Sequence, residues 1–200
     1  MAIVFLDMTQ SLDGFTSGPD VSPEHPLGRG GERLHDWLSS TADADLEASA
    51  QMFDNTGAFI LGRRTFDVGI DLWGEDGAFG RPCFVLTHRP CVSRIVGPTT
   101  FTFVSDGIDS ALMQARAAAG GKDICVMGGA DVGAQYMRAG VVDELRLHLV
   151  PLLLGNGARL LDALSAARLE EAGAVQTAHA THLRYRVLRP EACLLDKHLR

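Results

Sequence analysis

The segment that most constrains the fold is residues 123–137, which read DICVMGGADVGAQYM. Residues 124–127 form a short apolar run, and such a run predicts a β-strand that is buried on both faces. Gly128 and Gly129 follow at once, and apolar side chains then recur at helical spacing before Gly140. A strand that leads through two glycines into a helix predicts an α/β domain with backbone N–H groups at the carboxyl edge of its sheet.

Backbone N–H groups at the start of a helix carry partial positive charge, and glycine lets an anion approach the main chain closely. A phosphate group is therefore the ligand that this segment favours. The alternative is that the two glycines only permit a tight turn between strand and helix. The spacing is neither G-x-G-x-x-G nor that of a Walker A loop, so the other strand ends have to distinguish the two interpretations.

The composition fits a single globular domain with a small-molecule ligand. A chain of 200 residues with 46% apolar and 22% charged residues can bury a sizeable core, and we expect one domain over residues 1–190 followed by a tail, 191–200. The net charge of −7 argues against nucleic acid as a partner, since nucleic acid requires a basic surface. A small anionic ligand stays possible, because a few arginines and N–H groups can reverse the sign of the charge in one cleft.

Membrane, disulfide and metal chemistry are not expected. No apolar run reaches the roughly 18 residues of a membrane span, and the N-terminus has no basic flank before an apolar core, so we expect a cytoplasmic protein without membrane contact. The cysteines form no C-x-x-C pair, which predicts buried thiols rather than disulfides or metal ligands; they are Cys83, Cys91, Cys125 and Cys193. The histidines lack H-E-x-x-H or similar spacing, so no metal site is expected.

The rest of the chain alternates apolar runs with helical patterns. Strands are predicted at residues 2–7, 57–61, 83–86, 101–104 and 142–150, the last extended by 151–154. Helices are predicted at 32–39, from Thr41 or Asp43 to Phe53, and at 108–119. Residues 168–175 and 181–188 are predicted strands with no long helix between them, which indicates an antiparallel pair at a sheet edge.

Two segments between the first strand and residue 57 have open interpretations. Residues 19–31 are rich in Pro and Gly, which predicts a surface loop that could fold over a cleft. Trp37 could line a pocket, or it could fill the core. Asp45 is explained most simply as an acid in the first turn of a helix, where it favours the helix dipole.

Groups that bind phosphate follow three of the predicted strands. The motif GRRT (62–65) follows the strand at 57–61, THR (87–89) follows the strand at 83–86, and GGADV (128–132) follows the strand at 124–127. Arginine binds phosphate through paired N–H groups, and a threonine hydroxyl can also donate to a phosphate oxygen. Adjacent arginines are otherwise often only solvated surface, but these come directly after a buried strand.

In a doubly wound sheet these three strand ends lie side by side, so one ligand that spans them is extended and carries several anionic groups. A nicotinamide dinucleotide fits this description. Arg63, Arg64 and Arg89 provide more positive charge than one pyrophosphate needs, which favours a 2′-phosphate and therefore NADPH. The acidic residue that binds the ribose in NAD-dependent proteins has no obvious counterpart, which also favours NADPH.

The order of five motifs resembles a known group of proteins. The motifs are S-L-D-G after the first strand, then G-R-R-T-F, L-T-H-R-P, M-G-G and L-L-G-N-G-A-R-L-L. Together they resemble the dihydrofolate-reductase superfamily, and more closely the riboflavin-biosynthesis reductase domain and its stand-alone bacterial relatives. The resemblance covers residues 2–188. It implies a single three-layer α/β domain with a mixed, mostly parallel sheet flanked by helices, NADPH across the strand ends, and a homodimer.

Residue by residue, the resemblance implies four groups of cofactor contacts. Residues near the nicotinamide are Thr16 and Ser17; those of the phosphate-binding turn are Gly62, Arg63, Arg64 and Thr65; those on the adenosine side are Leu86, Thr87, His88 and Arg89; and those of the pyrophosphate loop are Met127, Gly128, Gly129, Ala130, Asp131 and Val132. Asp45 lies near the place of the carboxylate that serves the pterin in dihydrofolate reductases, but it lacks the P-W-x-L-P-x-D/E context and is not assigned that role.

The function that follows is an NADPH-dependent reductase that transfers a hydride to a small heterocyclic or carbonyl substrate, pterin-like or ribosylamino-pyrimidine-like. Asp13 and Trp37 are the candidate substrate contacts, although Asp13 as a turn residue would have no chemical role. No general acid can be named from the sequence. The missing acid motivates an alternative, a non-catalytic NADPH-binding or sensing module. A third possibility, an α/β domain without a ligand, requires all three phosphate-binding motifs to be coincidental.

Overall fold

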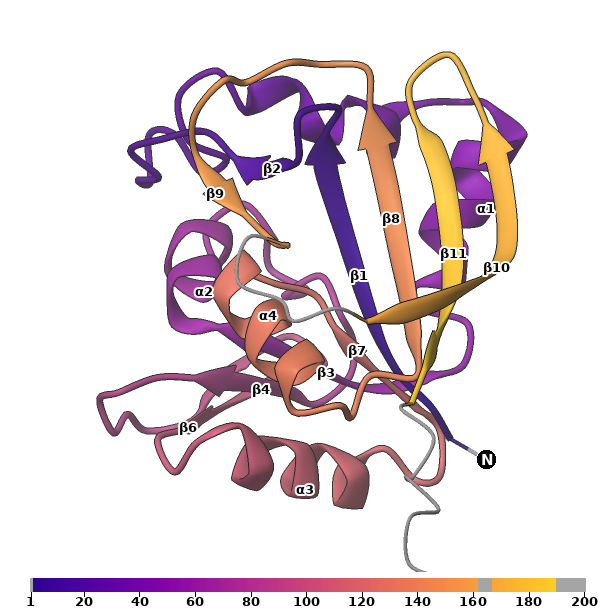
Figure 1. Ribbon diagram of the computed structural model, residues 1–200. Coiled ribbons are helices and arrows are strands. Elements are labelled where there is room, and N and C mark those ends of the chain that lie inside the picture. The colour runs from indigo at the N-terminus through magenta and orange to yellow at the C-terminus, as the bar shows by residue number, and fades with distance from the viewer. Residues whose placement is uncertain (1, 162–166, 190–200) are drawn as a thin grey trace, which may run out of the picture.

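The computed structural model describes residues 2–161 and 167–189. Within these residues nine strands form one mixed sheet in the order β10-β11-β8-β1-β7-β3-β4-β6-β5 (Figure 1). The parallel strands are β1 (Val4–Ser11), β3 (Thr56–Gly62), β4 (Cys83–Leu86), β6 (Thr99–Val104), β7 (Asp123–Val126) and β8 (Glu144–Val150). The antiparallel strands are β5 (Arg94–Val96) at one edge, and β11 (Thr181–Leu188) and β10 (Arg168–Gln176) at the other.

Helices cover both faces of this sheet and make three layers. One face carries α3 (Ile108–Ala118) and α4 (Ala130–Arg138); in Figure 1, α4 lies in front of the strands and α3 lies below β4 and β6. The other face carries the short 3₁₀ helix η1 (Glu32–Ser39), α1 (Asp43–Gln51) and α2 (Arg63–Gly69). A further small sheet pairs β2 (Phe15–Ser17) with β9 (Ala158–Arg159) at the end where β1 and β8 terminate.

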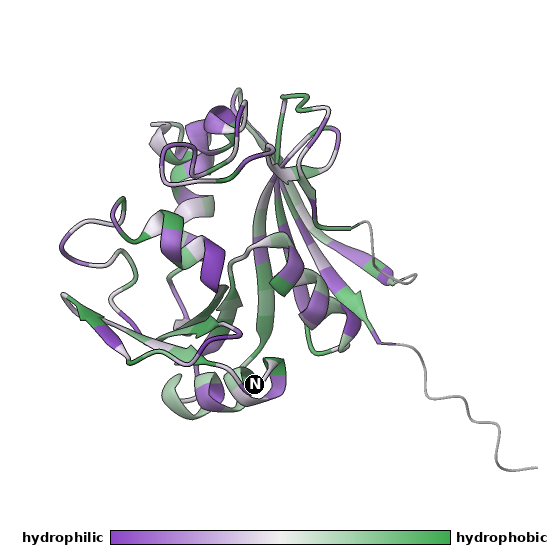
Figure 2. Ribbon diagram, turned by 90° about the vertical axis from the view of Figure 1, so that its left-hand side faces the viewer, coloured by the Kyte–Doolittle hydropathy of each residue, from purple (hydrophilic) through white to green (hydrophobic). Residues whose placement is uncertain are grey.

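The alternation of side chains along β1 divides the core into two parts. Leu6 packs in the cluster under α3 and α4, and Phe5 packs in the cluster on the α2 side. All eight residues of β1 are buried, as expected for a central strand of a parallel sheet with helices on both faces. Figure 2 shows long hydrophobic segments in the strands at the middle of the sheet, interrupted by hydrophilic ones, whereas both colours alternate along the helices.

The α/β class, the mostly parallel sheet and the antiparallel pair at its C-terminal edge are confirmed. Three short strands, β2, β5 and β9, were not predicted. The extension of β8 through residues 151–154 is wrong, because the strand ends at Val150 and Pro151 has no N–H to continue a ladder. The predicted tail, 191–200, lies outside the described residues.

Two of the cysteines are buried, Cys83 and Cys125, as predicted. Cys91 is exposed, which corrects the expectation of a buried thiol, and its sulfur contacts the Nη1 atom of Arg63 at 3.1 Å. Cys193 lies outside the described residues. In the described part of the chain, no helix combines the length and the apolar character needed to cross a membrane.

The loop of residues 18–31 is closed by hydrogen bonds within its own backbone. The N–H of Gly18 donates to the carbonyl of Leu27 and the N–H of Arg29 to that of Pro19, each at 2.8 Å. The two limbs approach so closely that a Cβ atom at Gly18 would collide with the Arg29 carbonyl oxygen. The loop is therefore a fixed part of the fold.

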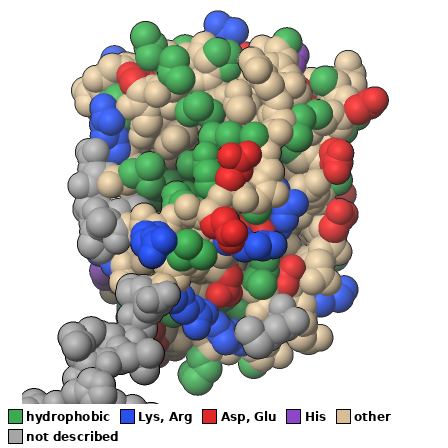
Figure 3. Space-filling model, turned by 45° about the vertical axis from the view of Figure 1, so that its right-hand side comes forward, with side chains coloured by type: hydrophobic (Ala, Val, Ile, Leu, Met, Phe, Trp, Pro, Cys, Tyr) green, Lys and Arg blue, Asp and Glu red, His purple; other side chains and the backbone are tan. Residues whose placement is uncertain are grey.

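The surface shows no field of a single charge sign on the face drawn in Figure 3. Acidic and basic side chains are interspersed there, next to a group of hydrophobic ones.

Candidate functional site

The turn after β3 and the turn after β7 are in direct contact. β3 and β7 are neighbouring parallel strands, with Ile60 in register with Val126, so both chains leave the sheet at the same edge. The N–H of Gly62 donates to the carbonyl of Gly128 at 2.8 Å. The sequence motifs GRRT and GGADV therefore belong to one site. Along the chain they are separated by a long segment that includes β4, β6, α3 and most of α2.

A cleft of about 1350 Å³ opens at this edge of the sheet. Every residue that the sequence analysis assigned to the cofactor lines it, in the segments 16–17, 62–65, 86–89 and 127–132. Pockets for drug-sized ligands are usually about 300–1000 Å³, so a cleft of this size has room for a larger, extended molecule. Val21, Pro26 and Leu27 of the loop 18–31 line the same cleft.

The two glycines shape the floor of the cleft. Gly128 has a φ of 120°, a backbone conformation that favours glycine, and the sulfur of Met8 lies 3.5 Å from where a Cβ atom would stand. Gly129 is the N-cap of α4 and has no side chain to occupy the free N–H groups of the first turn. Those N–H groups and the helix dipole favour a negatively charged ligand at this point.

The arginines differ in how far they are already paired. Arg63 donates from Nε to the Asp67 carboxylate at 2.7 Å, and this hydrogen bond raises the pKa of the guanidinium above its ordinary value. Its positive charge is therefore partly compensated within α2. Arg64 and Arg89 are exposed, and among the described residues their side chains form no hydrogen bond or ion pair. These two arginines have the freer capacity for an anionic ligand.

The two candidate substrate residues have different surroundings. The Asp13 carboxylate accepts hydrogen bonds from the N–H groups of Leu154 at 3.1 Å and Gly155 at 2.7 Å, and from the Ser11 hydroxyl. It joins two loops and is not among the residues that line the cleft. Trp37 does line the cleft, but its side chain is almost fully buried and its Nε1–H donates to the Thr9 hydroxyl at 3.1 Å.

A buried polar chain that the sequence analysis did not identify begins at this cleft. Asp7 of β1 lines the cleft, and its Oδ1 atom lies 3.0 Å from Nε2 of His148 on β8. Nδ1 of His148 lies 2.7 Å from Nδ1 of His182 on β11, and Nε2 of His182 lies 2.7 Å from Oδ1 of Asp45 on α1. The indole ring of Trp37 covers His148, with ring centroids 4.3 Å apart.

Asp45 is therefore more than an acid that favours a helix dipole. It does lie in the first turn of α1, as predicted, but it is 1% exposed and also accepts a hydrogen bond from the Thr177 hydroxyl at 2.9 Å. The available signal in the sequence was a polar residue at every second position of two late strands, Arg146 and His148 on one and His182 and Arg184 on the other.

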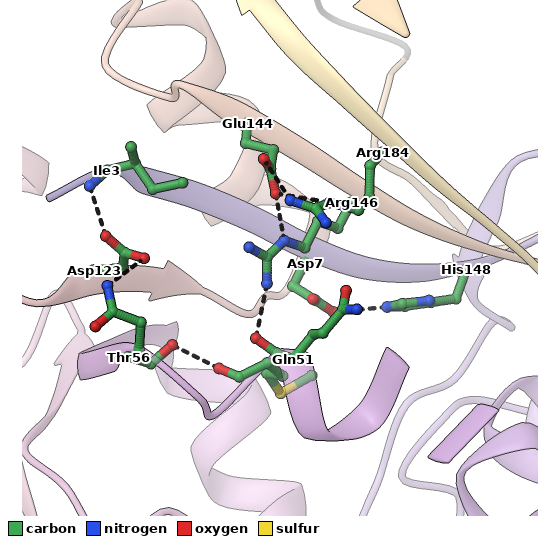
Figure 4. A network of polar contacts seen from close by, with 11 residues as sticks. Ile3, Asp7, Gln51, Thr56, Asp123, Glu144, Arg146, His148 and Arg184 are labelled. Carbon is green, nitrogen blue, oxygen red and sulfur yellow. Dashed lines mark hydrogen bonds and ion pairs between the residues drawn. The ribbon is translucent and has the colours of Figure 1, made fainter. Parts of the chain in front are cut away.

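A second polar cluster lies beside this chain on the same face of the sheet (Figure 4). The Glu144 carboxylate accepts from Nε of Arg146 at 2.6 Å and from Nη2 of Arg184 at 3.1 Å. Nη1 of Arg146 also donates to the Gln51 carbonyl at 2.9 Å, which ties the C-terminal end of α1 to the sheet. This cluster positions α1, and with it Asp45. No group of three or more candidate metal ligands is found within the described segments.

The sequence of the chain matches a known protein family and two curated proteins. The family model for the RibD C-terminal domain matches residues 2–183. The uncharacterized protein YyaP of Bacillus subtilis strain 168 is 28% identical over 165 residues, which cover 77% of each chain.

Solved structures show the same fold at low sequence identity. A putative riboflavin biosynthesis protein from Shewanella sp. PV-4 superposes with a TM-score of 0.67 at 19% identity, over 94% of this chain and 100% of the other. Dihydrofolate reductase from Enterococcus faecalis, solved in complex with NADP(H) and RAB-propyl, superposes with a TM-score of 0.61 at 15% identity, over 92% and 96%. These likenesses show that the fold is that of dihydrofolate reductase.

Proposed function

The chain belongs to the RibD C-terminal domain family, and from this premise we propose that it is an NADPH-dependent reductase. The substrate that we propose is a small heterocyclic or carbonyl compound, pterin-like or ribosylamino-pyrimidine-like. The observation that carries the proposal is that every residue expected to contact the cofactor lines one cleft of about 1350 Å³.

The residues of the cleft suit a dinucleotide phosphate. Gly128 and Gly129 leave the main chain open to a pyrophosphate at the start of α4, and the hydroxyl of Thr65 lies 3.4 Å from where a Cβ atom of Gly129 would stand. Arg64 and Arg89 reach the cleft with no protein partner among the described residues, which suits the additional 2′-phosphate. The Enterococcus faecalis dihydrofolate reductase, which has this fold, was solved with NADP(H).

In such a reaction the cofactor supplies the hydride, and the protein supplies binding, orientation and exclusion of water. Arg64, Arg89 and the N–H groups at the start of α4 would hold the phosphates. The apolar side chains of Val21, Pro26 and Leu27 would cover the substrate end of the cleft and keep water from it. The carboxylate of Asp7 is the acidic group of β1 that faces this space.

The proposal is tested in two steps. Calorimetry with NADPH measures binding, and an absence of heat would refute the cofactor assignment. A panel of dihydropterins, quinones and ribosylamino-pyrimidines, each with NADPH, then measures turnover as loss of the nicotinamide absorbance. Binding without turnover for the whole panel would favour the non-catalytic sensing module instead.

A further inference from the structure

We propose that Asp7, His148, His182 and Asp45 form a buried chain that stores one proton and delivers it, through Asp7, to the substrate in the cleft. The proposal rests on the proposed reductase function, for which the sequence offers no general acid. In this scheme Asp7 is the proton donor, and the other three residues act through it as positioning residues.

The number of protons follows from the three contacts. The contacts are Asp7–His148 at 3.0 Å, His148–His182 at 2.7 Å and His182–Asp45 at 2.7 Å. In each of them the two facing atoms are hydrogen-bond acceptors unless one of them carries a proton, so three hydrogen bonds require three protons. Two ionised carboxylates and two neutral imidazoles carry only two. One contact would then bring two lone pairs together in a buried site, where an unsatisfied polar group is costly. The geometry is satisfied when the chain holds one additional proton.

The additional proton has several positions that are linked by short shifts along the hydrogen bonds. It makes either imidazole an imidazolium, or it protonates Asp7 or Asp45 while all three hydrogen bonds persist. In each case the chain as a whole carries one negative charge. A proton can therefore pass from Asp45 to Oδ1 of Asp7 by shifts along the hydrogen bonds, and rotation of the Asp7 carboxyl group then presents it to a ligand.

The surroundings favour the end at the cleft. Burial lowers the pKa of His182 and His148 lowers it further, which outweighs the opposing effect of Asp45 and favours the neutral imidazole there. Burial alone would raise the pKa of Asp45, but hydrogen bonds from Ser40, His182 and Thr177 lower it, which favours the ionised carboxylate. The additional proton is thus disfavoured at the end of the chain that His182 and Asp45 form.

Asp7 has one oxygen left for a further contact. The residue is 4% exposed and lines the cleft, and its buried Oδ2 atom has no hydrogen-bond partner within the described residues. Because Leu6 is in register with Val126, Asp7 stands beside the end of β7, immediately before Gly128. Asp7 is therefore next to the segment that is expected to hold the dinucleotide.

The reaction balances with this donor. Bound NADPH would supply a hydride, which would form a C–H bond and reduce a C=N or C=O group of the substrate by two electrons. The proton from Asp7 forms the new N–H or O–H bond, and the O–H electron pair stays on the carboxylate. The chain, now with two protons, regains the third from solvent.

Other titratable groups face the chain from the neighbouring elements. Arg146 and Arg184 both pair with Glu144, so their positive charges are already compensated. Burial and the charge of Asp7 raise the pKa of the Cys125 thiol, which stays neutral. The remaining group is His35 of η1, which lines the same cleft. None of these groups provides a donor in hydrogen-bond contact with Asp7.

The first test counts protons and does not depend on turnover. Full-length protein with ¹⁵N-labelled histidine is examined by two-bond ¹H–¹⁵N NMR at neutral pH, with His148→Asn and His182→Asn used for assignment. We expect three protons on the three contacts, with both ring nitrogens of His148 protonated for a measurable fraction of the time. The proposal is overturned if both rings are neutral and each carries its proton on Nε2, because no proton then lies between Nδ1 of His148 and Nδ1 of His182.

Asp45→Asn is the sharpest variant. The amide can donate to Nε2 of His182, Nδ1 of His182 can then donate to His148, and Nε2 of His148 to Asp7, so two ring protons satisfy all three contacts. The variant should fold, and NMR should find the additional proton gone. If the four residues only support the structure, Asp45→Asn should leave the number of protons on the chain unchanged.

The second test measures kcat/KM against pH with NADPH and the best substrate of the panel. General acid catalysis is usually worth about a hundredfold or more, so we expect Asp7→Asn and Asp45→Asn each to lower the rate by about that factor. The wild-type rate should fall as the pH rises through the pKa of the stored proton, and Asp45→Asn should lose this dependence. Glu171→Gln, which removes an exposed carboxylate on β10 outside the cleft, is the control.

The outcomes separate the two proposals. Turnover that is equal in Asp45→Asn and the wild-type protein would overturn the chain while the reductase stands. A third proton found by NMR, without turnover of any substrate, would refute the reductase and with it the catalytic role of the chain. Both the third proton and the pH dependence are required to support the proposal.

Discussion

The backbone N–H of Gly62 donates a hydrogen bond of 2.8 Å to the carbonyl oxygen of Gly128. This bond fixes the turn that carries Arg64 against the turn that begins α4. Both turns line one cleft, so a ligand that contacts one of them is within reach of the other. The following predictions use this arrangement and the polar contacts around it.

Replacement of the two arginines together, Arg63→Ala with Arg64→Ala, should weaken NADPH far more than NADH. A hydrogen bond to a charged group contributes about 1.5–3 kcal/mol, which corresponds to about a tenfold to hundredfold change in Kd. Since Arg63 is paired with Asp67, Arg64→Ala alone should account for most of the loss. Calorimetry with both nucleotides measures the effect, and Arg94→Ala, on β5 outside the cleft, is the control. An equal loss of affinity for NADPH and NADH would show that these arginines do not bind the 2′-phosphate.

Gly128→Ala should weaken nucleotide binding, because Gly128 has a φ of 120° and lines the cleft. A side chain in a left-handed conformation costs about 1–2 kcal/mol. Gly140→Ala provides a matched control, since Gly140 also has a positive φ, 66°, and lies beyond the other end of α4 with nothing near its missing Cβ. Thermal unfolding should show a loss of stability for both variants, and NADPH titration a loss of affinity for Gly128→Ala alone. Equal affinity of the two variants would contradict the placement of the phosphate.

Glu144 should stabilise the fold in a pH-dependent way. Burial alone would raise its pKa, but hydrogen bonds and charge from Arg184 and Arg146 lower it below the ordinary value of 4.5. A carboxylate with a lowered pKa in the folded state stabilises the protein above its ordinary pKa, and this stabilisation is lost as the pH falls through the lowered value. Removing one partner of a buried pair costs about 3 kcal/mol, so urea unfolding of Glu144→Ala should show a loss of that order at neutral pH and a smaller one in acid.

The control for Glu144 is the exposed pair of Glu170 and Arg186, which lie 3.4 Å apart with side chains 55% and 69% exposed. An exposed pair contributes about 0–1 kcal/mol, so Glu170→Ala should change the unfolding free energy little. If the two variants lose the same stability, the buried cluster does not have the role described.

Asp13→Asn should affect the loops and not the ligand. The Ser11 hydroxyl and the N–H groups of Gly155 and Leu154 hold the pKa of Asp13 at about 2. The carboxylate therefore favours the folded state above its ordinary pKa, and its contribution is lost as the pH falls toward about 2. We expect a lower Tm with an unchanged Kd for NADPH, and no such change in Asp20→Asn, whose exposed carboxylate pairs with Arg29 at 3.5 Å. A raised KM with unchanged Tm would instead support a substrate contact.

The homodimer is a prediction that the β10–β11 face allows. Leu169 and Val187 are register partners, so they share a face, and Leu169 is 42% exposed. Pairing of this face in two copies would bury these side chains along with Tyr185, which is half-buried. Sedimentation should give twice the chain mass of 21.4 kDa, and Leu169→Asp should shift it to a monomer with unchanged circular dichroism. A wild-type chain that sediments only as a monomer refutes the prediction.

The sequence predicted those parts of the site whose residues lie close to one another along the chain or directly after a strand. Gly128 and Gly129 directly follow a buried strand, and Arg64 lies two residues past the end of another, so their places at one sheet edge follow from strand direction alone. The pairing of Arg63 with Asp67 was also accessible, because the two residues are four positions apart on one helix.

The polar chain could not be found in the same way. Asp7 and His148 are separated by 141 positions, and His182 and Asp45 by 137, so no local pattern brings them together. Only the strand order, with β11 beside β8 and β8 beside β1, aligns these side chains on one face. The same reason explains Asp13, whose partners Leu154 and Gly155 lie at the far side of the sequence.

The closed backbone of residues 18–31 has a consequence for how the protein distinguishes one substrate from another. If the protein is the reductase that we propose, a backbone closed in this way changes little between one bound compound and another, so this loop would contribute to selectivity through the shape of Val21, Pro26 and Leu27. Exchanging these three should retune which compounds are accepted while the scaffold stays intact, and the loop is the natural starting point for redesign.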